Sequence, residues 1–178
     1  AAVERHGRLD GAANCVGSLL LKPAHLTRAE EFADTVAQNL TSAFALVRAA
    51  ARAMMDGGGG SVVLVSSAAA RTGLPNHEAI AAAKAGVIGL AMSAAATYAS
   101  RNVRVNAVAP GLVRTPLTRR VTGSAAGEQA SLAMHALGRL GEPDDVASLI
   151  AWLLAPEHGW VTGQTFGVDG GLATLRAR

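Results

Sequence analysis

The sequence predicts an α/β fold in which helices cover a parallel sheet. Short apolar stretches rich in valine and alanine alternate with longer segments that carry helical patterns. Strands joined by helical crossovers pair in parallel, with the helices on the faces of the sheet. Ser61–Val65 is apolar at nearly every position, as expected for a central strand buried on both faces. The length of 178 residues is that of a single domain, residues 1–178.

The first half of the chain contains two expected strands and one long helix. Leu9–Cys15, a stretch of small and apolar residues, is the first strand. Residues 27–30 (Thr-Arg-Ala-Glu) have the pattern of a capping box and predict a helix that runs to about Met55. Asp56 and the glycines 57–60 end that helix, and Ser61–Val65 is the second strand.

The next elements are a helix, a strand and a polar segment. His77 to about Ser100 is rich in alanine and predicts a long helix suited to close packing. Val103–Val108 is the third strand, closed by Pro110 and Gly111. Thr118–Gly127 is polar and contains glycines, so we expect a loop or mobile lid.

Two further helices and a strand complete the expected fold. A helix is expected over about Glu128–Leu137. Pro143 suits the first turn of the next helix, where a missing N–H costs nothing, and the two aspartates that follow favour the positive end of its dipole. That helix stops before Pro156, and Gln164–Val168 is the last strand.

Composition argues against several classes of function. The net charge is only +3 and the arginines are spread along the chain, with the nearest approach to a cluster at Arg114, Arg119 and Arg120, so no nucleic-acid partner is expected. Cys15 is the single cysteine and the histidines lack paired ligand spacing, so no metal is expected. No apolar stretch approaches the ~20 residues of a membrane-crossing helix, so we expect a cytoplasmic protein with no membrane partner.

The segment from Ser66 to Leu90 carries the most specific pattern in the chain. Ser67 lies thirteen residues before position 80, and Lys84 lies four residues after it. This spacing resembles the active-site segment of the short-chain dehydrogenase/reductase family, in which a serine precedes a Tyr-x-x-x-Lys pair on a helix. Position 80, where the family has its tyrosine, is occupied by Ile80. An isoleucine can neither donate nor accept a proton, so the usual general acid is absent.

Four further segments match the same family in the same order. They resemble its Asn-Asn-Ala-Gly strand end, its helix asparagine, its Pro-Gly-x-x-x-Thr segment and its closing strand, and they are Ala13–Gly17, Asn39, Asn106–Thr115 and Val161–Gly171. The resemblance implies a Rossmann-like three-layer sandwich with a parallel sheet. It also implies that the protein binds NAD or NADP.

The resemblance assigns roles to individual residues. It implies catalytic roles for Ser67, which orients the substrate, for Lys84, which contacts the cofactor ribose, and for Asn39, which holds a proton-relay water. The implied cofactor-binding residues are Asn14, Gly17, Lys84, Pro110, Gly111 and Thr115. Each also has a structural interpretation: Ser67 as a strand-end cap, Asn39 as a bridge to backbone carbonyls, Lys84 as a surface side chain, and the others as shapers of strand ends.

Two residues are candidates to replace the missing tyrosine. Tyr98 lies fourteen positions beyond Lys84, roughly 21 Å away along one helix, which excludes it. His77 shares a helical face with Ile80 and Lys84, and histidine is a side chain that can act as an acid near neutral pH, so His77 is the candidate acid. A histidine that merely begins a helix is the simpler interpretation. Ser66-Ser67 lacks the flanking glycines of a hydrolase nucleophile.

The first half of the family's fold has no counterpart in this sequence. The Gly-x-x-x-Gly-x-Gly turn that holds the cofactor pyrophosphate at a helix N-terminus is absent, and the glycines 57–60 follow a helix and precede a strand. We therefore expect the C-terminal part only, without the first βαβαβ half, of a trimmed or partly seen protein. This chain alone should bind NAD(P) weakly or not at all, and Leu9–Cys15 should form an unpaired sheet edge.

The sequence supports three hypotheses about function. The first is a divergent NAD(P)-dependent short-chain oxidoreductase with a carbonyl or alcohol substrate. The second is a catalytically silent nucleotide-binding or assembly subunit, and the third is an inert fragment. Enzymatic activity, the substrate, the choice of NAD or NADP and the reaction direction stay open. We also expect a homo-oligomer, a dimer or tetramer, formed through the helices 30–55 and 77–100.

Overall fold

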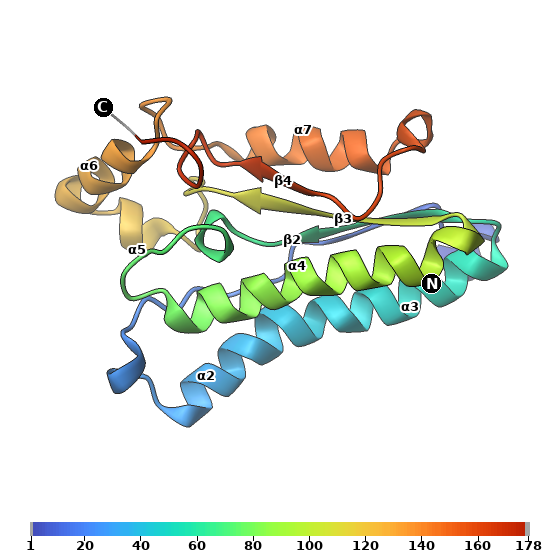
Figure 1. Ribbon diagram of the computed structural model, residues 1–178, viewed down its shortest axis with the longest axis horizontal. Coiled ribbons are helices and arrows are strands. Elements are labelled where there is room, and N and C mark those ends of the chain that lie inside the picture. Colours follow the sequence, from blue (N-terminus) through green and yellow to red (C-terminus); the bar gives the residue numbers. More distant parts are fainter. Residues whose placement is uncertain (1, 177–178) are drawn as a thin grey trace.

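The computed structural model describes residues 2–176, and within them the strands form one parallel sheet (Figure 1). The strand order is β1-β2-β3-β4, with every neighbouring pair parallel. The strands are β1 (Gly11–Asn14), β2 (Gly60–Val65), β3 (Val103–Pro110) and β4 (Thr165–Val168). The expected parallel α/β fold is therefore confirmed, with each strand within two residues of its expected position.

Helices cover both faces of this sheet, as Figure 1 shows. The helices α3 (Ser42–Asp56) and α4 (Glu78–Tyr98) lie on one face, and α7 (Pro143–Leu154) lies on the other. The remaining helices are α1 (Ala2–His6), α2 (Ala29–Val36), α5 (Arg119–Thr122) and α6 (Ala125–Met134). Short helical turns are η1 (Ala24–Leu26), η2 (Ala37–Thr41), η3 (Ala68–Ala70), η4 (Ala99–Arg101) and η5 (Pro156–His158).

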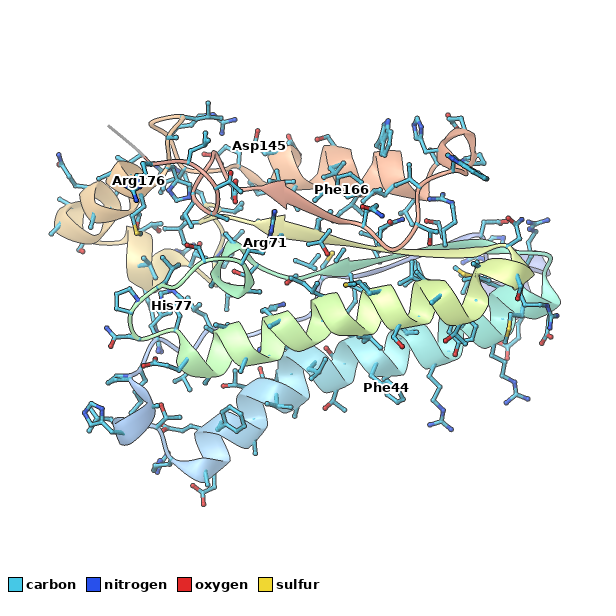
Figure 2. The ribbon with its side chains drawn as sticks, viewed as in Figure 1. Phe44, Arg71, His77, Asp145, Phe166 and Arg176 are labelled. Carbon is cyan, nitrogen blue, oxygen red and sulfur yellow. The ribbon has the colours of Figure 1, made fainter. Side chains whose placement is uncertain are left out.

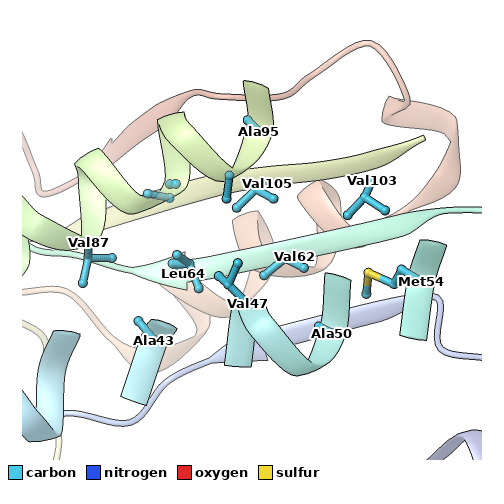
Figure 3. Packing of buried hydrophobic residues seen from close by; sticks show 13 residues of the cluster. Ala43, Val47, Ala50, Met54, Val62, Leu64, Val87, Ala95, Val103 and Val105 are labelled. Atoms are coloured by element: carbon cyan, nitrogen blue, oxygen red, sulfur yellow. The ribbon is translucent and has the colours of Figure 1, made fainter. Parts of the chain in front are cut away.

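Two apolar clusters fill the space between the layers. The larger one joins α3 and α4 to the sheet and is built mainly from alanine and valine (Figure 3); its members include Ala43, Val47, Ala50, Met54, Val62, Leu64, Val87 and Val105. The smaller one lies under α7 and centres on Val63, Val108 and Leu153. Alternate residues of β2 therefore face opposite clusters, which explains why the whole strand is apolar.

The two edges of the sheet differ from its centre. β2 and β3 are buried along almost their whole length, whereas two of the four residues of β1 are exposed. Within the described residues β1 pairs with β2 alone, so its outer side presents unpaired backbone groups, as expected for an edge strand.

The first long helix differs from its expected form at its start and in its middle. The cap is Arg28 rather than Thr27, because the Glu31 carboxylate accepts the Arg28 N–H at 2.9 Å. Thr27 instead donates its hydroxyl proton to the Pro23 carbonyl at 3.0 Å. Between α2 and α3 the helix widens into the π-helical turn η2, which contains Asn39. Such turns are frequent at functional sites.

Two other expectations require correction. The segment Thr118–Gly127 is not a loop, because α5 and the first turn of α6 lie within it; α6 begins three residues earlier than expected. By length and composition alone, Glu78–Arg101 could cross a membrane, contrary to the expectation that no apolar stretch is long enough. Its buried side chains pack on the sheet and on α3, which is the arrangement of a core helix.

Candidate functional site

The carboxyl ends of the strands meet at one edge of the sheet, and most of the expected site residues lie there. β1 ends at Asn14, β2 is followed by Ser66 and Ser67, and β3 ends at Pro110. Open α/β sheets bind ligands outside these strand ends. The second turn of α4 brings Lys84 to the same edge, next to the end of β2.

Lys84 holds a buried ammonium at this edge. The residue is 7% exposed, and its Nζ donates a hydrogen bond to the Val65 carbonyl oxygen at 2.8 Å. Among the described residues, this carbonyl is its one hydrogen-bond acceptor, and none of their carboxylates forms an ion pair with it. Burial lowers the pKa of Lys84 from 10.5 to about 8, an effect that nearby Cys15 partly offsets.

Ile80 occupies the position one helical turn before Lys84. The side chain is 4% exposed and belongs to the apolar interior. The backbone of this part of α4 is fixed by Ser66, whose hydroxyl donates to the Lys84 carbonyl at 2.8 Å. The position at which the resemblance implies a tyrosine is therefore apolar and buried.

Asn39 and Lys84 converge on Gly17. The Asn39 amide nitrogen donates to the Thr35 carbonyl at 2.9 Å and to the Ser18 hydroxyl at 3.0 Å, and its oxygen accepts the Ser18 N–H at 3.2 Å. A Cβ atom on Gly17 would lie 2.8 Å from Asn39 Oδ1 and 3.4 Å from Lys84 Nζ. Asn39 thus makes the backbone bridge of its structural interpretation, and does so beside the lysine.

Ser67 and Asn14 each bind their own strand end. The Ser67 hydroxyl accepts the Ala69 N–H at 3.1 Å and caps η3. Because the oxygen accepts in that bond, the hydroxyl proton remains available to an oxygen of a substrate. Asn14 Oδ1 accepts the Val16 N–H at 2.8 Å, and its amide nitrogen lies 3.4 Å from the Ser42 hydroxyl. Ser67 and Asn14 therefore make the bonds of their structural interpretations, and neither set of bonds uses the hydroxyl proton of Ser67.

His77 lies immediately before α4, at the end of the preceding loop (Figure 2). Its Nδ1 is 2.7 Å from the Pro75 carbonyl oxygen, which can only accept, so Nδ1 carries the proton. The imidazole is thereby tied to its own loop. Its role as an acid in place of the tyrosine stays a prediction.

Pro110 is the last residue of β3, and the turn that follows contains Gly111 and Thr115. The Gly111 N–H donates to the Val168 carbonyl of β4 at 3.0 Å. The Thr115 hydroxyl lies 3.1 Å from the Thr118 hydroxyl, which also accepts the Thr115 N–H at 3.1 Å. These bonds fix the path of the chain from the end of β3 into α5.

His135, which sequence reasoning missed, holds this turn from the other side. It is 3% exposed, and its Nε2 accepts the Leu112 N–H at 3.1 Å across 23 residues of sequence. Its Nδ1 is 2.7 Å from the Ser131 carbonyl oxygen. No motif or spacing marks this histidine, and its position near the end of an expected helix is the only signal in the sequence.

A cavity of about 480 Å³ opens at the ends of β3 and β4. Its walls include His135, the buried Asp169 and the ion pair of Arg139 with Asp145, whose two hydrogen bonds measure 2.7 and 2.8 Å. Of the expected site residues Gly111 lines it, whereas Lys84 and Ser67 do not. Among residues 2–176, no three histidine, cysteine or acidic side chains are placed to hold a metal ion.

Comparison with known proteins places the chain in a family. The family model described as enoyl-(acyl carrier protein) reductase matches residues 1–173. The 3-oxoacyl-(acyl-carrier-protein) reductase FabG of Vibrio cholerae is 40% identical over 80% of this chain and 58% of its own length. FabG of Thermotoga maritima is 38% identical over 96% of this chain and 68% of its own length.

A third relative, from Xanthobacter autotrophicus, is named inactive 2-(S)-hydroxypropyl-CoM dehydrogenase 2. It is 35% identical over 95% of this chain and 75% of its own length. The chain therefore spans between 58% and 75% of the length of these three relatives.

Solved structures agree with the sequence matches. A short-chain dehydrogenase/reductase from Mycobacterium ulcerans has a TM-score of 0.93 and 36% identity, covering 98% of this chain and 64% of that one. A tyrosine-to-phenylalanine variant of ElxO with NADPH bound has a TM-score of 0.91 and 28% identity, covering 98% and 71%. The chain belongs to the short-chain dehydrogenase/reductase family.

Proposed function

We propose that this chain is part of a divergent NAD(P)-dependent oxidoreductase that acts on a carbonyl or alcohol group and transfers the proton inefficiently. The buried ammonium of Lys84 carries the proposal. Desolvating a charge is costly unless it is paired, and a perturbed pKa in such a place is typical of functional sites. Because the chain spans only part of its relatives' length, the activity of the whole protein belongs to the proposal.

The residues around Gly17 fit a nicotinamide nucleotide. A lysine ammonium has three N–H donors, and one of them is used by the Val65 carbonyl, so two are available to ribose hydroxyls. Gly17 leaves the space that a Cβ would fill beside Lys84 and Asn39. When bound, the nicotinamide would supply or accept the hydride. The chain's own residues would bind the ribose through Lys84 and hold a substrate oxygen through the Ser67 hydroxyl.

Proton transfer is the step that this site supports poorly. The Ile80 side chain is 4% exposed and has no proton to donate. General acid catalysis contributes typically ~10²–10⁴-fold to a rate, so turnover of ordinary carbonyl substrates should be slow. His77 is the residue we expect to supply any remaining proton transfer.

A second candidate function is a catalytically silent subunit that binds a nucleotide or supports assembly. The observation that favours it concerns His77, the candidate replacement acid. One nitrogen of the His77 imidazole, Nδ1, is bonded to the Pro75 carbonyl of the preceding loop. A protein that keeps Lys84 and lacks the acid could bind a nucleotide without catalysing a reaction.

The substitution Ile80→Tyr distinguishes the two functions. In the full-length protein, we expect it to raise the rate at which NADH or NADPH is oxidised in the presence of a panel of ketones by ~10²-fold or more, because positions 80 and 84 are one helical turn apart. Ile88→Tyr, two turns further along α4, is the matched control and should not raise it. Thermal unfolding of each variant checks that the larger ring is tolerated.

Other outcomes have definite meanings. NADPH binding without any gain in turnover by Ile80→Tyr would support the silent subunit. Any slow wild-type activity should be abolished by His77→Ala. A wild type that reduces ketones rapidly and is unaffected by His77→Ala would contradict our account of the site.

Assembly and location remain proposals. The outward faces of α3 and α4 carry exposed apolar side chains, such as Phe44 and Met92, and Figure 2 shows Phe44 directed away from the sheet. These features support a homo-oligomer formed through residues 30–55 and 77–100. Light scattering that shows a monomer at micromolar concentration would contradict it. The cytoplasmic location expected from composition is likewise a prediction.

A further inference from the structure

We propose that His135 is a positioning residue that holds the turn after β3 in place, and that protonation of its imidazole releases this turn. The residue lies directly after α6, at the point where that helix meets the ends of β3 and β4. Of the five histidines, all within the described residues, it is the one that is buried.

The two hydrogen bonds of the ring define its protonation state. The Ser131 carbonyl, 2.7 Å from Nδ1, can only accept, so Nδ1 carries a proton. The Leu112 N–H, 3.1 Å from Nε2, can only donate, so Nε2 carries none. His135 is therefore the neutral Nδ1–H tautomer, and both of its nitrogens are used.

Close packing prevents the ring from turning to other partners. A Cβ on Gly111 would lie 2.7 Å from Nε2 and 3.0 Å from the Asp169 Cα, so only glycine lets the turn approach the imidazole. On the other side, a Cβ on Gly170 would lie 3.5 Å from the ring. The Leu137 N–H also donates to the Gly170 carbonyl at 3.0 Å. The imidazole is thus clamped between the turns that follow β3 and β4.

Protonation removes the bond to the turn. A proton on Nε2 would face the Leu112 N–H, so two donors would oppose each other where one hydrogen bond existed. Carboxylates on the elements around the ring already have partners: Asp169 accepts from the N–H groups of Gly171 and Ala173, Asp145 pairs with Arg139, and Glu128 in α6 pairs with Arg114.

The released turn is the one that contains Gly111 and Thr115, which we expect to border the nicotinamide. This last step rests on the proposed function; the hydrogen bond between His135 and Leu112 does not. If both hold, acidification should raise the KM for NAD(P)H before it unfolds the protein.

Hydrogen exchange at the Leu112 amide tests the bond directly. In the wild type, after correction for the intrinsic exchange rate, protection should be about tenfold lower at pH 5 than at pH 7.5. His135→Gln keeps an acceptor near the position of Nε2 and does not titrate, so its Leu112 protection should be the same at both pH values. His25→Gln, on the exposed turn η1, should behave like the wild type.

Two further measurements keep the proposal testable if a variant fails to fold. The amide of Val105, a residue of β3, is bonded to the Thr162 hydroxyl and reports on the core. Its protection should be equal at both pH values. The nitrogen NMR spectrum of wild-type His135 should show the Nδ1–H tautomer at neutral pH. An Nε2–H tautomer, or Leu112 protection that does not change at pH 5, would overturn the proposal. Neither readout depends on turnover, so failure of the proposed function would leave them intact.

Discussion

Arg104 and Lys84 are two buried cations on opposite faces of the sheet, 8% and 7% exposed, and they differ in how their donors are used. The Arg104 guanidinium donates hydrogen bonds to three carbonyl oxygens, those of Leu153 (2.9 Å), Val161 (3.1 Å) and Ala155 (3.2 Å). Two of these belong to the end of α7, where free carbonyls and the helix dipole favour a cation. Lys84, by contrast, donates a hydrogen bond to one carbonyl oxygen among the described residues, that of Val65.

The difference separates a structural charge from an available one. Burial lowers the pKa of both side chains. Arg104 recovers much of the desolvation cost through hydrogen bonds that join β3 to α7, so its charge is part of the fold. Lys84 recovers little within the described chain, so its spare donors are available to a ligand. If this contrast is right, removing the first charge should destabilise the protein and removing the second should not.

Arg104→Met should have the largest effect on stability. It removes three hydrogen bonds that join β3 to α7 and the segment after it, and each contributes about 1 kcal/mol. Every one of the three carbonyls keeps another donor, which is the Ser61 hydroxyl for Leu153, the Asn106 amide for Val161 and the His158 N–H for Ala155. We therefore expect the free energy of unfolding to fall by about 3 kcal/mol. Urea denaturation at pH 7 measures it. A variant as stable as the wild type would remove the contrast.

Lys84→Met should stabilise the protein, the opposite of the effect expected for Arg104→Met. A pKa lowered from 10.5 to about 8 corresponds to about 3 kcal/mol against the charged form. Methionine keeps the apolar stem and loses one hydrogen bond, so we expect the free energy of unfolding to rise by about 2 kcal/mol at pH 7. The same urea denaturation measures it, and a loss of stability would show that the ammonium serves the fold. Binding of NAD(P)H should weaken in the same variant.

The smallest expected effect is the pH dependence of the difference in unfolding free energy between Lys84→Met and the wild type. Between pH 8 and about 10.5 the unfolded chain holds a proton on Lys84 that the folded chain does not, so wild-type stability should rise with pH across this window. Below pH 8 both states are protonated, and the cost of the buried charge is constant. The advantage of Lys84→Met should therefore shrink as pH rises from 8 to 10.5. An advantage independent of pH would mean that another property of the side chain causes it.

Much of the fold could be predicted because its signals are local. The alternation of apolar strands and helical patterns placed all four described strands and both long helices of the α3–α4 face. Errors arose where local signals competed, as at residues 27–31, where two acidic residues follow two possible caps. The polar segment after Thr115 was expected to be a loop because its helices are short and its glycines common; Ser124, whose hydroxyl accepts the Gly127 N–H, begins α6 there.

The site could be predicted only in part, because only some of its signals lie within one element. The spacing of Ser67, Ile80 and Lys84 is a property of one turn and one helix, and the structure keeps it. The convergence of Asn39 and Lys84 on Gly17, by contrast, brings together residues from a π-helical turn, a core helix and a strand end. No pattern in the sequence specifies the distances among such elements.

By itself, the sequence determined the kinds and order of the elements, the family resemblance and the replacement of the tyrosine by Ile80. Those properties follow from backbone periodicity and from spacings within single elements. Only the tertiary structure decided that Lys84 is buried with one acceptor, that Arg104 completes the end of α7, and that His135 holds the turn after β3. Each depends on contacts between residues far apart in the chain, which are set by how the layers pack.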